Sequence, residues 1–227
     1  MKRLFINERV KEIANNRTPV KIFDTAKIIL HIMPESSINS DIKHDIEIVT
    51  RNPARLEPIK SIGVESSHTY DGFVTYTSDL TGLARTYVHL YKNGRIEAVE
   101  CSLLKPIVDR KEIPSVDFEK EIIEVIPKYV QILQLLNIKP PFFMFLSLAG
   151  VKDYTMKLNQ NILGANPVPI EEDEIKTEEI YVKEYWWFDD VPRLFRPAFD
   201  EIWNACGMFK SFNFDEDGNW GNGLNMK

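Results

Sequence analysis

A long amphipathic segment followed by an unbroken apolar run constrains the fold of this chain more than any other feature. Apolar residues recur at three- and four-residue spacing from Phe118 to Leu136, which predicts a helix over about 117–136 that opens at Asp117. The prolines at 140–141 end this helix, and residues 142–150 (FFMFLSLAG) have the length and apolar character of a buried strand. Both elements need a second layer to pack against, so the sequence predicts a helix on a sheet.

Shorter segments predict further strands on both sides of this helix. Residues 85–91 and 95–100 are joined by Asn93-Gly94, a pair that suits a type I′ hairpin turn because both residues tolerate positive φ. Strands are also predicted over 26–33, 73–76, 154–158 and 179–185, and helices over 6–16 and about 192–206. This order predicts an α+β fold, with the long and C-terminal helices packed on a mixed, mostly antiparallel sheet. We expect a single domain over 1–227, with a frayed tail at 221–227.

The composition is that of a globular protein with unevenly distributed charge. Hydrophobic residues make up 44% of the chain, and no run approaches the roughly 18 apolar residues of a membrane span. Two cysteines and the lack of an apolar leader favour a reduced, cytoplasmic compartment. Residues 171–190 hold nine acids and two lysines, whereas residues 1–60 hold eleven Lys or Arg and eight acids. An acidic chain repels a polyanion, which argues against this chain being the main nucleic-acid-binding part of a protein. A local basic patch remains compatible with the charge count.

Residues 213–220 (NFDEDGNW) begin like a calcium-binding loop. Leu224 stands where a bidentate Glu should close such a loop, and no second helix follows. We therefore expect an Asx-rich turn that holds Trp220 against the body of the protein, and no metal site.

The histidines and short motifs give no catalytic assignment. His31 lies in a predicted apolar strand, and His89 alternates with Tyr87 and Tyr91, so both are expected to be structural histidines. The chain has no Gly-x-Ser-x-Gly elbow and no Walker-type phosphate loop. We predict no catalytic residue, no metal ligand and no cofactor.

One alternative is a metal-dependent nuclease or hydrolase, because carboxylates on neighbouring strands can bind Mg²⁺. Its residues would be Asp71, Glu97 and Glu100, with His68 as a possible helper. Strand alternation places residues 97 and 100 on opposite faces of a sheet unless a bulge intervenes, which counts against this alternative.

An aromatic segment is the best candidate for a partner-binding surface. Tyr185, Trp186, Trp187 and Phe188 are adjacent and stand beside acids rather than arginines. Nucleic-acid stacking platforms usually pair aromatic with basic residues, whereas aromatics among polar residues mark protein interfaces.

The mildly basic N-terminal region supports a further alternative, direct contact with DNA. Arg9, Lys11, Arg17 and Lys21 belong to one predicted helix and the residues that follow it. A solvated helix face explains such a charge run more simply.

Taken in order, seven segments resemble one known family. They are RTPV (17–20), KIILHIMP (27–34), LYKNGRIEAV (90–99), IPSVDFE (113–119), LSLAGVKDY (146–154), LFRPAFDEIWNACG (194–207) and FDEDGNW (214–220). They are similar to the C-terminal region of bacterial proteins that carry an N-terminal Schlafen-type, AlbA-like DNA-binding domain and are often described as ATP-binding proteins. The likeness is collinear and spans nearly all 227 residues.

The resemblance implies an association with an AlbA-like domain, and it implies no reaction for this chain. In such proteins the AlbA-like domain is credited with nucleic-acid or nucleotide binding, and it would lie upstream of Met1, in a separate or a longer chain. The resemblance therefore implies a non-catalytic accessory or sensing domain that acts with an AlbA-like, Schlafen-type protein by binding a partner or a small ligand. Self-association is the alternative to that partner, and any involvement of nucleic acid would be indirect.

Overall fold

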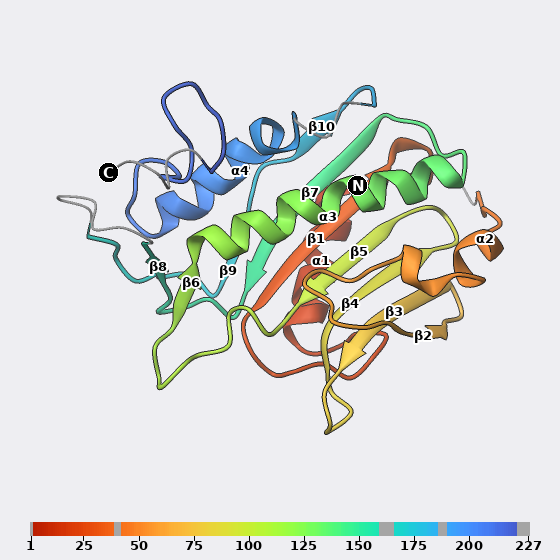
Figure 1. Ribbon diagram of the computed structural model, residues 1–227, viewed down its shortest axis with the longest axis horizontal. Coiled ribbons are helices and arrows are strands. Elements are labelled where there is room, and N and C mark those ends of the chain that lie inside the picture. The colour runs from red at the N-terminus through yellow and green to blue at the C-terminus, as the bar shows by residue number, and fades with distance from the viewer. Residues whose placement is uncertain (1, 39–41, 159–165, 186–189, 222–227) are drawn as a thin grey trace.

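An eight-stranded antiparallel sheet forms the centre of the protein, as a computed structural model shows (Figure 1). The structure describes residues 2–38, 42–158, 166–185 and 190–221. The strand order is β10-β7-β1-β5-β4-β3-β2, and β9 pairs with β7 as well. The strands are β1 (Lys27–Pro34), β2 (Glu65–His68), β3 (Gly72–Ser78), β4 (Ala84–Tyr91), β5 (Ile96–Glu100), β7 (Phe142–Ala149), β9 (Glu174–Lys176) and β10 (Ile180–Val182).

Helices and a small second sheet complete the fold. The predicted α+β class is confirmed, and the parallel pairing between named strands lies in the separate two-stranded sheet of β6 and β8. The remaining elements are α1 (Lys2–Ala14), α2 (Glu47–Thr50), α3 (Ser115–Leu135), α4 (Val191–Ala205), β6 (Glu112–Pro114), β8 (Thr155–Lys157) and two 3₁₀ turns, Glu35–Ser37 and Pro53–Arg55. Within the described residues, no helix combines the length and apolar character that crossing a membrane requires.

The two predicted helices, α3 and α4, cover one face of the sheet (Figure 1). The apolar stripe of α3, including Phe118, Ile122 and Ile126, packs into one core with apolar residues of β1, β5 and β7. All eight residues of β7 are buried, because α3 and α4 lie over one of its faces and α1 lies over the other. A strand covered on both sides reads as a continuous apolar run, which explains the sequence FFMFLSLA.

The opposite face of the sheet is covered by α1. The helix predicted over 6–16 is α1, which begins at Lys2 and ends at Ala14, and its buried stripe consists of Ile6, Val10 and Ile13. These residues pack on Ile29, Tyr87 and other residues of the central strands. Polar side chains of the sheet, Glu97 among them, lie on this face beside the apolar ones.

The hairpin between β4 and β5 is confirmed, but the predicted type I′ turn is wrong. The amide of Gly94 donates to the carbonyl of Tyr91 at 2.9 Å, and the amide of Tyr91 donates to the carbonyl of Arg95 at 2.9 Å. Gly94 has φ +86°, whereas Asn93 is not among the residues with positive φ. This is a three-residue loop, in which a type I turn is followed by a glycine in the left-handed region.

The C-terminal segment is held against α3 by a buried carboxylate. Glu119 accepts hydrogen bonds from Trp203 Nε1 at 2.8 Å, Ser211 Oγ at 2.7 Å and Trp220 Nε1 at 2.7 Å. Asp215 Oδ1 accepts from the Asn219 amide at 2.7 Å, which closes the turn before Trp220. The expected Asx-rich turn that holds Trp220 against the body is therefore present.

Candidate functional site

The most unusual feature under α1 is a fully buried carboxylate, Glu97, in the middle of the sheet. Alternation along β5 directs Ile96 and Ala98 into the α3 core and Glu97 toward α1. Glu97 is paired directly with His31 on β1 and with His89 on β4. Side chains of paired residues share a face, so the register alone brings two histidines beside this carboxylate.

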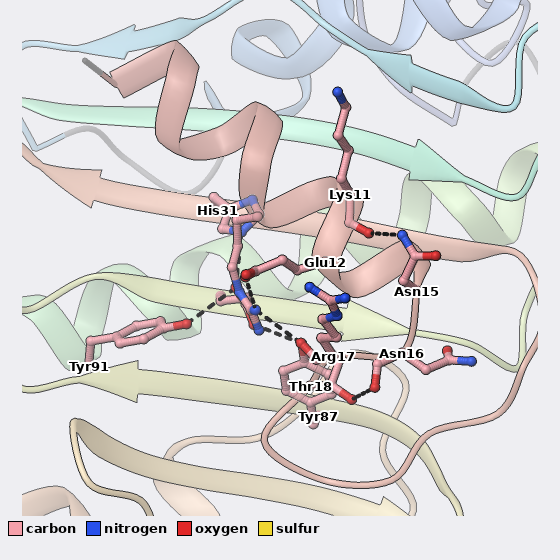
Figure 2. A network of polar contacts seen from close by, with 11 residues as sticks. Lys11, Glu12, Asn15, Asn16, Arg17, Thr18, His31, Tyr87 and Tyr91 are labelled. Carbon is pink, nitrogen blue, oxygen red and sulfur yellow. Dashed lines mark hydrogen bonds and ion pairs between the residues drawn. The ribbon is translucent and has the colours of Figure 1, made fainter.

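Four side chains donate to Glu97. Arg9 of α1 reaches it with two nitrogens, Nε to Oε2 at 2.6 Å and Nη2 to Oε1 at 2.9 Å. Tyr87 donates to Oε1 at 2.7 Å and Tyr91 to Oε2 at 3.4 Å. The His31 Nε2 lies 3.2 Å from Oε2 and must carry a proton, because a carboxylate only accepts. Figure 2 shows His31, Tyr87 and Tyr91 directed toward a common centre beneath α1.

These contacts fix the charge of the network. Burial acts to raise the pKa of Glu97, but the hydrogen bonds and positive charges of His31 and Arg9 outweigh it and hold this pKa well below its usual range. Burial, together with the charge of Glu97, raises the pKa values of Tyr87 and Tyr91. At neutral pH, therefore, Glu97 is ionised and both phenols are protonated.

His89, which is itself buried, forms a second group with Thr69 and the exposed Asp71 at the edge of this network. Its Nε2 lies 2.9 Å from the hydroxyl of Thr69 and 3.5 Å from a carboxylate oxygen of Asp71. Its Nδ1 is buried and has no hydrogen-bond partner within the part of the chain that the structure describes. Burial lowers the pKa of His89 despite the opposing charge of Asp71. A nucleophile–histidine–acid relay needs the acid on the ring nitrogen that the nucleophile does not use. Thr69 and Asp71 both lie at Nε2 of His89, so these three residues do not form a nucleophile–histidine–acid relay.

Two adjoining hollows open beside the network, each of about 410 Å³. They share Phe5, Asp71 and Tyr91 as walls, and we call them together the α1 hollow. One is lined further by Arg9 and His89, so the network forms part of its wall. The other extends toward residues 42–43 and the β4–β5 turn.

The residues of the metal-dependent alternative do not converge. Glu97 lies under α1, whereas Glu100 pairs with Ile28 of the opposite core and accepts from the amides of Ser102 and Leu103, each at 2.8 Å. His68 is on the exposed strand β2, with its ring 5.1 Å from that of Phe73. Within the described residues, no group of three His, Cys, Asp or Glu side chains is arranged to hold a metal ion.

The four predicted nucleic-acid residues do not act as one surface. Arg9 points inward to Glu97, and its side chain is only 14% exposed. Lys11, Arg17 and Lys21 are exposed, and Figure 2 shows the Lys11 side chain directed away from the network. The Arg17 carbonyl accepts from Arg9 Nη1 at 3.0 Å, which ties the end of α1 to the site.

Of the predicted partner-binding residues, the structure describes Tyr185 alone. Its hydroxyl donates to the Ile138 carbonyl at 2.7 Å, and its ring packs 5.8 Å from that of Phe142. Trp186, Trp187 and Phe188 lie outside the described residues.

Comparison with known proteins adds no assignment, since no family model, curated protein or solved structure matches the chain. The site is therefore interpreted from its own chemistry. Sequence reasoning placed His89, Tyr87 and Tyr91 on one face but missed Arg9 as the partner of Glu97, because the two lie 88 positions apart.

Proposed function

We propose that the chain is a non-catalytic accessory or sensing domain that binds a small ligand in the α1 hollow and acts with an AlbA-like, Schlafen-type protein. The observation that carries the ligand-binding part is an open hollow whose wall includes Arg9, a cation held in place by the buried carboxylate of Glu97 behind it. Preformed concave sites with a few fixed polar groups are typical of ligand binding.

The electrostatics of the network favour binding over catalysis. A general acid or base works best with a pKa near the working pH, and the pKa of Glu97 is far from it. Its donors are locked as well, since the Arg9 side chain is bonded on one side to Glu97 and on the other to Glu12, at 2.8 Å. Such an arrangement keeps the wall of the hollow in one shape.

A thermal-shift screen with a matched pair of variants tests this proposal. Ile42 lines the hollow and is 44% exposed, whereas Ile48 is equally exposed, at 46%, on α2 outside it. We expect a panel of small organic anions, including phosphate esters, to contain a compound that raises the Tm, since ligand at 100 times Kd stabilises by about 2.7 kcal/mol. Ile42→Trp should abolish the shift and Ile48→Trp should preserve it. A panel without any stabilising compound, or a shift indifferent to Ile42→Trp, would refute ligand binding in the hollow.

The partner rests on the sequence resemblance and needs its own experiment. The purified chain and an AlbA-like protein from the same genome would be mixed and examined by size-exclusion chromatography with light scattering. We expect a complex of defined stoichiometry that Tyr185→Ala weakens. Independent elution at micromolar concentration would remove the AlbA-like partner from the proposal without affecting the ligand site.

A further inference from the structure

The α1 hollow combines positive charge with aromatic rings, although the chain as a whole is acidic. Its part next to the β4–β5 turn is lined by three cations, Lys43, Lys92 and Arg95, against one acid, Asp71. The formal net charge of the whole chain is −6. A concave cationic site on an acidic protein concentrates anions locally while the remaining surface repels large polyanions.

The cations are positioned by neutral groups rather than neutralised by carboxylates. Arg95 donates from Nη2 to the Ser37 carbonyl at 2.6 Å, and its guanidinium lies 4.5 Å from the centre of the Phe5 ring. Lys92 Nζ donates to the Tyr70 carbonyl at 3.0 Å. Among the described residues, no carboxylate lies within ion-pair distance of Lys43, Lys92 or Arg95. Their charge is therefore available to an anionic ligand.

The same part of the hollow contains a solvent-exposed aromatic ring, that of Tyr70. Tyr70 lines the hollow and is 99% exposed, so its ring contributes nothing to the core. Tyr91 and Phe5 line the hollow too, but their rings are engaged with His89, at 4.0 Å between centres, and with Arg95. Of the three described rings that line this part of the hollow, the Tyr70 ring is the one with a free face for stacking. Aromatic rings interleaved with basic side chains are the combination with which proteins bind bases joined to phosphates.

We propose that the α1 hollow binds a nucleoside phosphate, either free or at the end of a single strand. This inference rests on the proposed function and names its ligand. The base stacks on Tyr70, and the phosphate is held by Lys43, Lys92 and Arg95. An anion without a ring would leave Tyr70 unused, and a nucleoside without a phosphate would leave the three cations unpaired.

Calorimetric titration with four probes separates these contributions. The probes are AMP, adenosine, ribose 5-phosphate and a 5′-phosphorylated deoxythymidine decamer. We expect AMP to bind at least about tenfold more tightly than adenosine or ribose 5-phosphate, since it alone of the three uses both the ring and the cations. A decamer that binds more tightly than AMP identifies a strand end as the source, and equal affinity identifies the free nucleotide; both outcomes support the inference.

Variants at exposed positions keep the test independent of folding. Tyr70→Ala should weaken AMP binding about fivefold or more, while Leu80→Ala, an equally exposed apolar position outside the hollow, should not. Lys43→Gln should weaken AMP but not adenosine, and Lys120→Gln on α3 serves as its control. Ribose 5-phosphate binding as tightly as AMP, with no effect of Tyr70→Ala, would overturn the nucleotide inference and leave the ligand-binding proposal intact. Nucleotide binding insensitive to Ile42→Trp would place the ligand elsewhere and overturn both.

Discussion

The Arg9–Glu97 pair makes a quantitative prediction about the stability of the α1 face. Glu97 is completely buried and the Arg9 side chain is 14% exposed, so each charge depends on the other for its solvation. Arg9→Met keeps an unbranched apolar stem but ends near the position of Nε, so it removes both nitrogens that bond to the carboxylate. The ionised Glu97 is then left with His31 and two phenols as its donors.

The size of the effect follows from the loss of one partner in a buried ion pair. Removing one member of such a pair costs about 3–5 kcal/mol, because the other charge stays buried without compensation. When position 97 is Gln, the same Arg9→Met change should cost only about 1–2 kcal/mol, since no charge is stranded and mainly packing is lost. The expected coupling energy between the two positions, the difference between these costs, is therefore about 1–4 kcal/mol.

Urea denaturation of the four proteins of the double-mutant cycle measures this coupling, provided that the m values agree. Arg3→Met on the same helix is the matched control, since Arg3 pairs with the exposed Glu178 at 3.5 Å and its loss should cost less than about 1 kcal/mol. If the costs of Arg9→Met and Glu97→Gln add within about 0.5 kcal/mol, the pair is not energetically coupled and our account of the site is wrong.

Three further changes test other parts of the structure. The folded pKa of Glu97 lies below its unfolded value of about 4.3, so the unfolded state takes up the proton first as the pH falls. The free energy of unfolding should therefore decrease as the pH falls from about 5 toward the folded pKa. Glu97→Gln should make this decrease smaller in urea melts at about pH 3–6. Gly94→Ala should lower the free energy of unfolding by about 1–2 kcal/mol, because Gly94 has φ +86° and a Cβ there would lie 2.6 Å from Ile138 Cδ1. An unchanged urea midpoint would contradict this geometry. Trp220→Phe should cost about 1.5–3 kcal/mol by removing a donor to Glu119 and should speed protease cleavage within residues 207–221, whereas unchanged cleavage would mean that this bond does not hold the segment.

The elements with strong local patterns were predictable from the sequence. The helix expected over about 117–136 is α3 at Ser115–Leu135, and the C-terminal helix expected over about 192–206 is α4 at Val191–Ala205. A long apolar period or an unbroken apolar run identifies an element without knowledge of its neighbours. The short strands β2, β6 and β9 were not predicted, because three or four residues carry no period and are defined only by their pairing.

The candidate site was not predictable in the same way, because distant segments build it. Arg9, Glu97, His31 and Tyr87 come from α1, β5, β1 and β4, and each is unremarkable within its own segment. In the sequence, the aromatic residues at 185–188 stand beside acids and not beside basic residues. The fold produces a pairing of aromatic with basic residues in the α1 hollow, between residues 5 and 95.

One turn decides whether this site exists at all. With the predicted type I′ turn at Asn93-Gly94, the two-residue loop would pair Leu90 with Glu97 and turn the carboxylate into the apolar α3 core. The observed three-residue loop pairs His89 with Glu97 and Leu90 with Ile96. The sequence contained this signal, because the second register places Ile96 opposite Leu90 on the α3 side, whereas the first would place the charged Glu97 there. A shift of one residue moves every side chain to the other face, so Gly94, which contributes no side chain to the network, determines that Glu97 meets Arg9.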